Sequence, residues 1–170
     1  MKESMMAEMS REEKRQRVIE VLNQARSMEL HAIHQYMNQH YNLDDQDYGE
    51  LAGKVREISI DEMRHAEWFA ERIKDLDGEP TTKMDGMVTK GQDVHDVFPF
   101  SRDLEDDTLV KYNQFLVVCR ELGDYVSANI FERVIIEEQK HWDYFDDTDS
   151  HIKKLGDHFL ANMAATDDNE

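Results

Sequence analysis

The sequence predicts an all-α fold: a four-helix bundle with a long crossover loop between its second and third helices and a short fifth helix at the C-terminal end. Helix-forming residues such as Leu, Met, Glu and Ala are common, while only two prolines and seven glycines interrupt 170 residues. Apolar residues recur three and four positions apart through four long segments. A repeated pattern of Glu and His interrupts each of these apolar stripes, as expected for a bundle that holds a site in its core.

The composition indicates one domain of ordinary size. We expect residues 17–164 to form the bundle, residues 1–16 a flexible N-terminal extension and residues 165–170 a disordered tail. No segment resembles a signal peptide or a membrane span, so a cytoplasmic location is expected. The single cysteine, Cys119, excludes an internal disulfide framework and a Cys-only metal site. Its position on an apolar stripe predicts that it belongs to the core.

The net charge of −18 comes from 38 acidic against 20 basic residues. No basic surface is expected, so nucleic acid is not a predicted partner. Cations are predicted partners, although the acidity is equally explained by solubility alone.

The first half of the chain predicts two helices. The first runs from about residue 17 to Tyr41, and a polar turn follows over 42–49. The second runs from about Glu50 to Leu76, where Gly78 and Pro80 are stop signals. A loop of roughly twenty residues, 81–100, is too long for a tight turn and predicts a crossover between two parallel helices.

The second half predicts the other helices. The third is expected to begin near Pro99 or Ser101, because proline is tolerated in the first turn of a helix but kinks its interior. Residues 92–97 are a candidate for one additional turn before that start. The fourth begins near Asp124 and runs past His141. Residues 152–163 predict the short fifth helix.

One ligand pattern occurs twice at the same offset. A lone Glu precedes a Glu-x-x-His by 33 positions, and each member of the second copy stands 76 positions after its counterpart. The copies are Glu29, Glu62 and His65, then Glu105, Glu138 and His141. Each Glu-x-x-His places both side chains on one helix face. Buried carboxylates are costly unless they are paired or bind metal, so the pattern predicts a two-metal site that suits iron, manganese or zinc.

Other residues near this pattern leave alternatives open. Glu105 is predicted to begin its helix, where Asp106 or Asp107 could replace it as a ligand, and Glu137 also lies one turn from His141. Tyr36 shares a face with Glu29 and could donate an electron or a hydrogen bond, or be a buried aromatic. Met63 points away from Glu62 and, considered alone, is a packing residue.

The chain resembles the bacterioferritins, the haem-containing branch of the ferritins. The resemblance runs from about residue 18 to 164 and includes the segments MELHAIHQY at 28–36, SIDEMRHAEWFAERI at 59–73, DYVSANIFERVIIEEQKHWDYF at 124–145 and HIKKLGDHFLANM at 151–163. The chain departs from the family's usual pattern at His34 and Met37, where the family commonly has Asn and Phe near the haem. The segment FPFSRDLEDD, which opens the third helix, is also unlike the family.

This resemblance implies a ferritin-like subunit assembled from dimers into a homo-oligomeric cage of 24 copies. It implies that the six pattern residues bind the di-iron (Fe²⁺/Fe³⁺) ferroxidase pair, with Tyr36 nearby. It also implies that Met63 binds haem b across a two-fold axis between subunits.

The predicted function is therefore iron storage and detoxification, in which Fe²⁺ is oxidised to Fe³⁺ by O₂ or H₂O₂. A di-iron or di-manganese peroxidase or catalase that stores nothing could use the same ligands. A third hypothesis is a haem-binding electron-transfer bundle that uses Met63.

Overall fold

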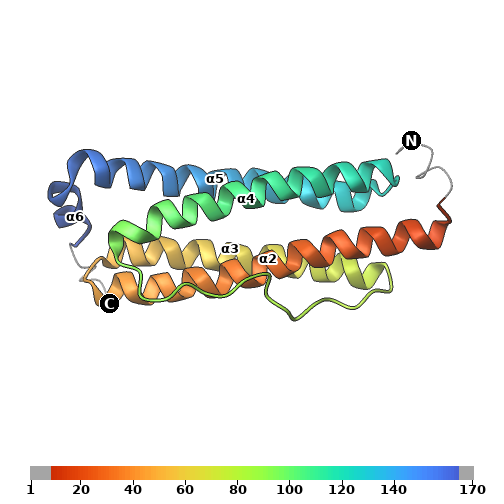
Figure 1. Cartoon of the computed structure of the whole chain (residues 1–170), viewed down its shortest axis with the longest axis horizontal. Helices are drawn as coiled ribbons and strands as arrows, with labels where there is room; N and C mark the ends of the chain where they lie inside the picture. The colour runs from red at the N-terminus through yellow and green to blue at the C-terminus, as the bar shows by residue number, and fades with distance from the viewer. Residues whose placement is uncertain (1–8, 165–170) are drawn as a thin grey trace.

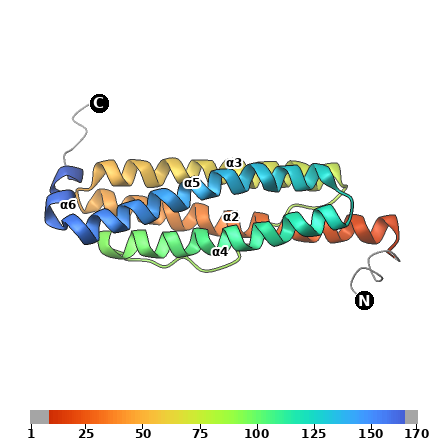
Figure 2. The ribbon, with the colours of Figure 1, turned by 90° about the horizontal axis from the view of Figure 1, so that it is seen from above.

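The computed structural model describes residues 9–164, and within them the chain is entirely helical apart from turns and one long loop. The helices, labelled as in Figure 1, are α2 (Arg11–Asp45), α3 (Gly49–Asp75), α4 (Val94–Glu121), α5 (Tyr125–Leu155) and α6 (Asp157–Met163). The first four lie side by side as a bundle, and α6 packs at one end of it (Figures 1 and 2). The predicted ferritin-like bundle with a short fifth helix is confirmed.

The predicted crossover is also confirmed. The loop after α3 runs back along the length of the bundle, so that α3 and α4 are parallel (Figure 1). Buried amides hold this loop on α2. Gln35 exchanges two hydrogen bonds with the backbone of Thr89 and also donates to the side chain of Gln92, which accepts from Gln39 as well. These contacts explain how a long loop without secondary structure stays ordered.

The first helix begins earlier than expected. Residues 11–16 belong to α2, although the sequence analysis assigned them to a flexible extension. Ser10 caps the helix: its hydroxyl accepts from Glu13 N–H, and the Glu13 carboxylate accepts from Ser10 N–H. This reciprocal capping box satisfies two free N–H groups and fixes the start of the helix. Residues 1–8 of the predicted extension and the predicted tail, 165–170, lie outside the described residues.

The third bundle helix begins at Val94, before Pro99 and Ser101, so the additional turn considered for residues 92–97 belongs to it. Asp93 caps it by accepting from two N–H groups of the first turn, and Val97 and Phe98 are fully buried. Pro99 therefore lies inside the helix. It removes one hydrogen bond from the early helix, and the cap and the burial of its neighbours outweigh that loss. As a consequence Glu105 is well inside α4 and does not begin it.

The last two helices meet at Gly156, which has a φ of 52°. Residues 152–155, expected in the fifth helix, form the end of α5 instead. Glycine adopts a positive φ without steric cost, and this conformation interrupts the helical backbone. Gly156 is therefore the single residue between α5 and α6.

The apolar core is divided into two clusters, one toward each end of the bundle. One cluster includes Val18, Phe69 and Phe131, and the other includes Tyr36, Phe98 and Phe145. On each of the four long helices, the residues of the ligand pattern lie between the two clusters. The core thus leaves a polar layer near the middle of the bundle, enclosed by packed side chains. Cys119 is completely buried in the first cluster, as predicted.

Candidate metal centre

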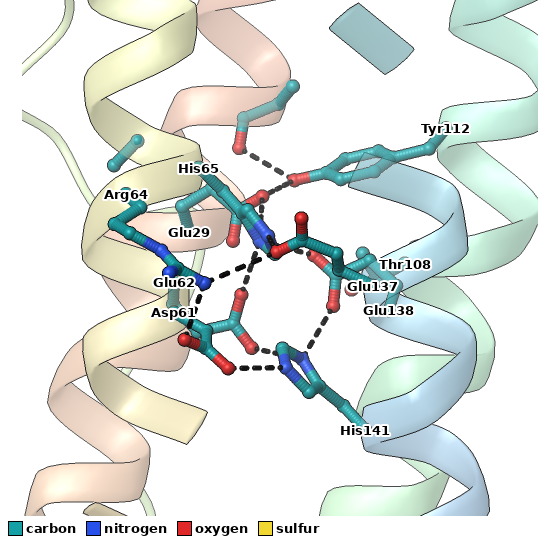
Figure 3. A network of polar contacts seen from close by, with 12 residues as sticks. Glu29, Asp61, Glu62, Arg64, His65, Thr108, Tyr112, Glu137, Glu138 and His141 are labelled. Carbon is teal, nitrogen blue, oxygen red and sulfur yellow. Dashed lines mark hydrogen bonds and ion pairs between the residues drawn. The ribbon is translucent and has the colours of Figure 1, made fainter. Parts of the chain in front are cut away.

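The structure brings the six pattern residues together from all four long helices. Their exposed fractions are 2% for Glu29, 1% for Glu62, 0% for His65, 2% for Glu105, 1% for Glu138 and 5% for His141. Four carboxylates and two imidazoles thus converge in the buried interior of the bundle. Figure 3 shows five of these residues close together: Glu29, Glu62, His65, Glu138 and His141.

The six residues form two groups of four. One group contains Glu29 and His65, the other contains Glu105 and His141, and both include Glu62 and Glu138. Within each group the potential ligand atoms lie within 4.8 Å of one another. Two metal positions that share two carboxylates are therefore possible. Each position also has one Glu and one His that belong to it alone, which we call its private residues.

The two shared carboxylates face both histidines. Glu62 Oε2 lies 2.9 Å from His65 Nδ1, and Glu62 Oε1 lies 3.0 Å from His141 Nδ1. Glu138 mirrors this arrangement, with Oε1 3.1 Å from His65 Nδ1 and Oε2 3.2 Å from His141 Nδ1. Despite these short distances, Glu62 Oε1 and Glu138 Oε1 accept no well-directed hydrogen bond within the described residues. Buried oxygens without partners are costly, and a cation would satisfy them.

The charges of the cluster shift its protonation equilibria in opposite directions. Burial alone would lower the pKa of His141, but the adjacent Glu62 carboxylate and contacts with Glu138 raise it to about 12. Glu138, Glu62 and Glu29 likewise raise the pKa of His65 against the effect of burial. Burial would raise the pKa of Glu62, yet the neighbouring histidines hold it well below its usual range.

The two private glutamates behave differently. Burial, followed by repulsion from Glu138 and Glu62, raises the pKa values of Glu29 and Glu105 well above the ordinary range. Without metal, the cluster therefore holds protons in place of cations. Two divalent ions would replace these protons and neutralise the carboxylates.

Each histidine has a carboxylate on its outer nitrogen. Glu137 Oε2 lies 3.1 Å from His65 Nε2, and Asp61 Oδ2 lies 3.4 Å from His141 Nε2. Arg64 joins the two carboxylates, at 2.6 Å from Asp61 and 3.4 Å from Glu137 (Figure 3). Such partners fix the tautomer of a metal-ligating histidine and leave Nδ1 free to bind the metal. Glu137 thus lies outside the cluster, on the far side of His65.

The structure also separates Glu105 from its neighbours. Glu105 is buried and faces the cluster, whereas Asp106 and Asp107 are exposed. Tyr36 is completely buried and donates a hydrogen bond to Glu105 Oε1. The predicted proximity of Tyr36 to the site is therefore observed.

Sequence reasoning missed Tyr112 as a site residue. Its hydroxyl is 2.6 Å from Glu29 Oε1, to which it donates a hydrogen bond, and 3.2 Å from the carbonyl oxygen of Ala25. The sequence contains one indication of this role: Tyr112 stands 76 positions after Tyr36, at the same offset as the two copies of the ligand pattern.

Comparisons with known proteins agree with this geometry. Residues 19–155 match the model of the ferritin-like domain. The bacterioferritin of Desulfovibrio desulfuricans is 60% identical over 157 residues, which cover 92% of this chain and 88% of that protein. The bacterioferritin BfrA of Mycobacterium tuberculosis is 36% identical over 144 residues, covering 85% of this chain and 91% of that protein.

Solved structures give the same result. A crystal structure of the D. desulfuricans bacterioferritin, described with its di-iron site in different catalytic states, matches with a TM-score of 0.92 at 59% identity and covers 93% of this chain and 92% of that one. The chain belongs to the bacterioferritin family. Bacterioferritins are iron-storage proteins with ferroxidase chemistry, and the Glu and His cluster is compatible with their di-iron site.

Met63 lies on the outer surface of α3, away from the buried cluster. Its side chain is 43% exposed, whereas its neighbour Glu62 is buried. Met63 lines a shallow groove of about 520 Å³ between α2 and α3, together with Leu30, Ile33 and Ile60. Arg26 and Arg64 lie at the same groove.

No helix within residues 9–164 is long and apolar enough to cross a membrane.

Proposed function

We propose that this chain is a bacterioferritin-type ferroxidase, which oxidises Fe²⁺ with O₂ or H₂O₂ and stores the ferric product in a homo-oligomeric cage. One observation carries the proposal: two buried groups of four ligands share Glu62 and Glu138. This sharing lets two ions lie close enough to act on one oxidant, which a pair of separate sites would not allow.

The donor atoms fit iron. Carboxylate oxygens and imidazole nitrogens without thiolate suit iron, manganese and related ions. Glu62 and Glu138 each have one buried carboxylate oxygen without a hydrogen-bond partner among the described residues, so both residues would be available to hold metal. Glu29 with His65 would complete one position, and Glu105 with His141 the other.

When two Fe²⁺ ions are bound as substrate, they would supply the electrons that reduce the oxidant. The protein contributes the geometry and the environment. The shared carboxylates hold the two positions together, and the private residues close each position from a different helix. Asp61 and Glu137 orient the histidines through their outer nitrogens. The surrounding apolar clusters exclude bulk water, so each charge interaction in the site is stronger than it would be at the surface.

Rapid mixing of the metal-free protein with Fe²⁺ and O₂ tests the proposal. The wild-type chain should show a rapid oxidation phase, and Glu62→Ala should abolish that phase because both metal positions lose a ligand. Asp106→Ala, an exposed control beside Glu105, should keep it. A rapid phase of unchanged rate in Glu62→Ala would contradict the proposal.

We propose that the assembly is a cage of 24 subunits built from dimers, in the cytoplasm. Family membership supports the cage. Size-exclusion chromatography with light scattering should give a mass of hundreds of kDa. A dimer or tetramer would instead favour a peroxidase or catalase that stores no mineral, with the same ligands.

We further propose that Met63 binds haem b at a two-fold interface between subunits. The exposed thioether on a groove lined by Leu30, Ile33 and Ile60 supports this, because a contiguous exposed apolar patch is typical of a protein-interaction or ligand-binding surface. Two copies of the groove facing each other would provide two thioether ligands and an apolar enclosure.

A further inference from the structure

The internal repeat extends beyond the six ligands. Three more pairs stand at the same offset of 76 positions: Tyr36 and Tyr112, Asp61 and Glu137, and Phe69 and Phe145. Each pair lies on equivalent helices of the two halves, α2 with α4 or α3 with α5. The two halves therefore repeat the surroundings of the site as well as its ligands.

The contacts of the tyrosines cross between the halves. Tyr36, in the first half, donates to Glu105 of the second half, and its ring packs on Phe145 at 5.3 Å between centroids. Tyr112, in the second half, donates to Glu29 of the first half, and its ring meets Phe69 edge-on at 5.7 Å. Each private glutamate is thus held by a tyrosine from the opposite half.

The hydrogen bond from Tyr112 contacts one particular oxygen of the Glu29 carboxylate. Tyr112 binds Oε1 of Glu29, the oxygen that lies 3.8 Å from His65 Nδ1. Both residues are buried, so no bulk water can replace the hydroxyl. A fixed donor on one oxygen restricts rotation of the carboxylate about its last bond, and this restriction would keep Glu29 and His65 directed at the same metal position.

We propose that Tyr112 is the positioning residue for the metal position formed by Glu29 and His65, and that Tyr36 has the same role for Glu105 and His141. In each metal position, the orientation of one glutamate is then fixed by a tyrosine from the opposite half of the chain. The two positions are therefore held in the same way. The inference rests on the proposed di-metal function and adds Tyr112 to its machinery.

A purely structural role would look different. The Tyr112 hydroxyl also lies 3.2 Å from the carbonyl oxygen of Ala25, so a structural role would consist of tying α4 to α2. In that case its hydroxyl would affect the stability of the bundle and would not distinguish between the two metal positions.

Co²⁺ titration of the metal-free, assembled protein separates these roles, because Co²⁺ binding is seen in its visible absorption and involves no iron oxidation. The wild-type chain should bind two Co²⁺. Tyr112→Phe, which keeps the packed ring, should weaken one position 10- to 100-fold, as loss of a partner of a metal ligand typically does, and leave the other unchanged.

Single-position backgrounds identify which ion is affected. In Glu105→Ala, the remaining position is that of Glu29 and His65, and adding Tyr112→Phe should cost the same 10- to 100-fold. In Glu29→Ala, adding Tyr112→Phe should change Co²⁺ affinity less than about twofold. Tyr36→Phe should give the mirror-image result, which also tests the inference if Tyr112→Phe fails to assemble.

Tyr144→Phe is the matched control, because the buried Tyr144 hydroxyl has no hydrogen-bond partner within the described residues. It should leave both Co²⁺ affinities unchanged. Two Co²⁺ bound with unchanged affinities in Tyr112→Phe, or both positions weakened equally, would overturn the inference alone. A wild-type chain that binds no Co²⁺ at these ligands would overturn the proposed function as well.

Discussion

Removing a carboxylate that belongs to both groups of ligands should weaken metal binding at both positions, whereas removing one that belongs to a single group should weaken it at one position. Glu62 belongs to both groups of four ligands, whereas Glu29 and Glu105 each belong to one. Partners of metal ligands contribute about 10- to 100-fold in affinity, so a direct ligand should contribute at least about 100-fold, or about 2.8 kcal/mol. Glu105→Ala should therefore cost about that amount at one position. Glu62→Ala should cost it at both, or about 5.6 kcal/mol for the pair.

Isothermal titration of the metal-free protein with Co²⁺ measures this difference. We expect two ions per chain for the wild type, one tight ion for Glu29→Ala or Glu105→Ala, and none at the wild-type affinity for Glu62→Ala. Asp107→Ala, which removes an exposed carboxylate next to the α4 ligand, should still bind two. Loss of only one ion in Glu62→Ala, or of both ions in Glu105→Ala, would refute the idea of two positions with shared carboxylates.

Three other predictions test the haem site, the loop after α3 and the core. Met63→Leu keeps an apolar side chain but lacks the thioether, so haem-reconstituted protein should lose its Soret band while helix content stays constant; an unchanged band would exclude Met63 as the ligand. Gly78→Ala should lower the free energy of unfolding by about 1–3 kcal/mol, because the new Cβ would lie 2.9 Å from Ile73 Cγ2 and 3.1 Å from the Ile73 carbonyl oxygen. Gly53→Ala, where a Cβ meets nothing within 4 Å, should instead raise it by about 0.5–1 kcal/mol in the same denaturant titration. Phe131→Ala should lower it by about 3–5 kcal/mol, since Phe131 is fully buried among aromatic rings, and a cost below about 1 kcal/mol would contradict the described packing.

The sequence was sufficient to predict the bundle, because its apolar stripes and its few helix breakers have local causes. The ligand positions are similarly readable: Glu62 and His65 share a face by helical geometry alone. Their burial followed from the apolar residues around them. The structure therefore agrees with the sequence for the four long apolar stripes and for the Glu and His residues that interrupt them.

The predicted starts of two helices were wrong because a capping residue, and not the composition of the segment, determines where each helix begins. Residues 11–16 are highly charged and suggested a flexible segment, yet the capping box of Ser10 and Glu13 starts the helix there. Pro99 suggested a helix start, yet Asp93 caps α4 earlier and places the proline inside it. Charge and proline content are average properties of a segment, whereas a cap is a specific pair of hydrogen bonds.

Contacts between helices were the least predictable. Tyr112 was visible only as a member of an apolar stripe, and its hydrogen bond to Glu29 depends on how α4 packs against α2. Likewise, Asp61 and Glu137 lie beside ligands in sequence but serve the histidine of the other half. In the sequence, only the 76-position offset connects these residues. The offset indicates that they occupy equivalent positions in the two halves, but it does not indicate that each contacts a residue of the opposite half.

Anomalous diffraction at the iron edge, from crystals soaked anaerobically in Fe²⁺, tests the central claim most directly. The account predicts two peaks per chain, both in contact with Glu62 and Glu138. One peak should lie at about 2.0–2.1 Å from His65 Nδ1 and the other at the same distance from His141 Nδ1, close to the distance between zinc and an imidazole nitrogen. A single peak, or iron bound at the outer Nε2 atoms beside Asp61 and Glu137, would contradict it.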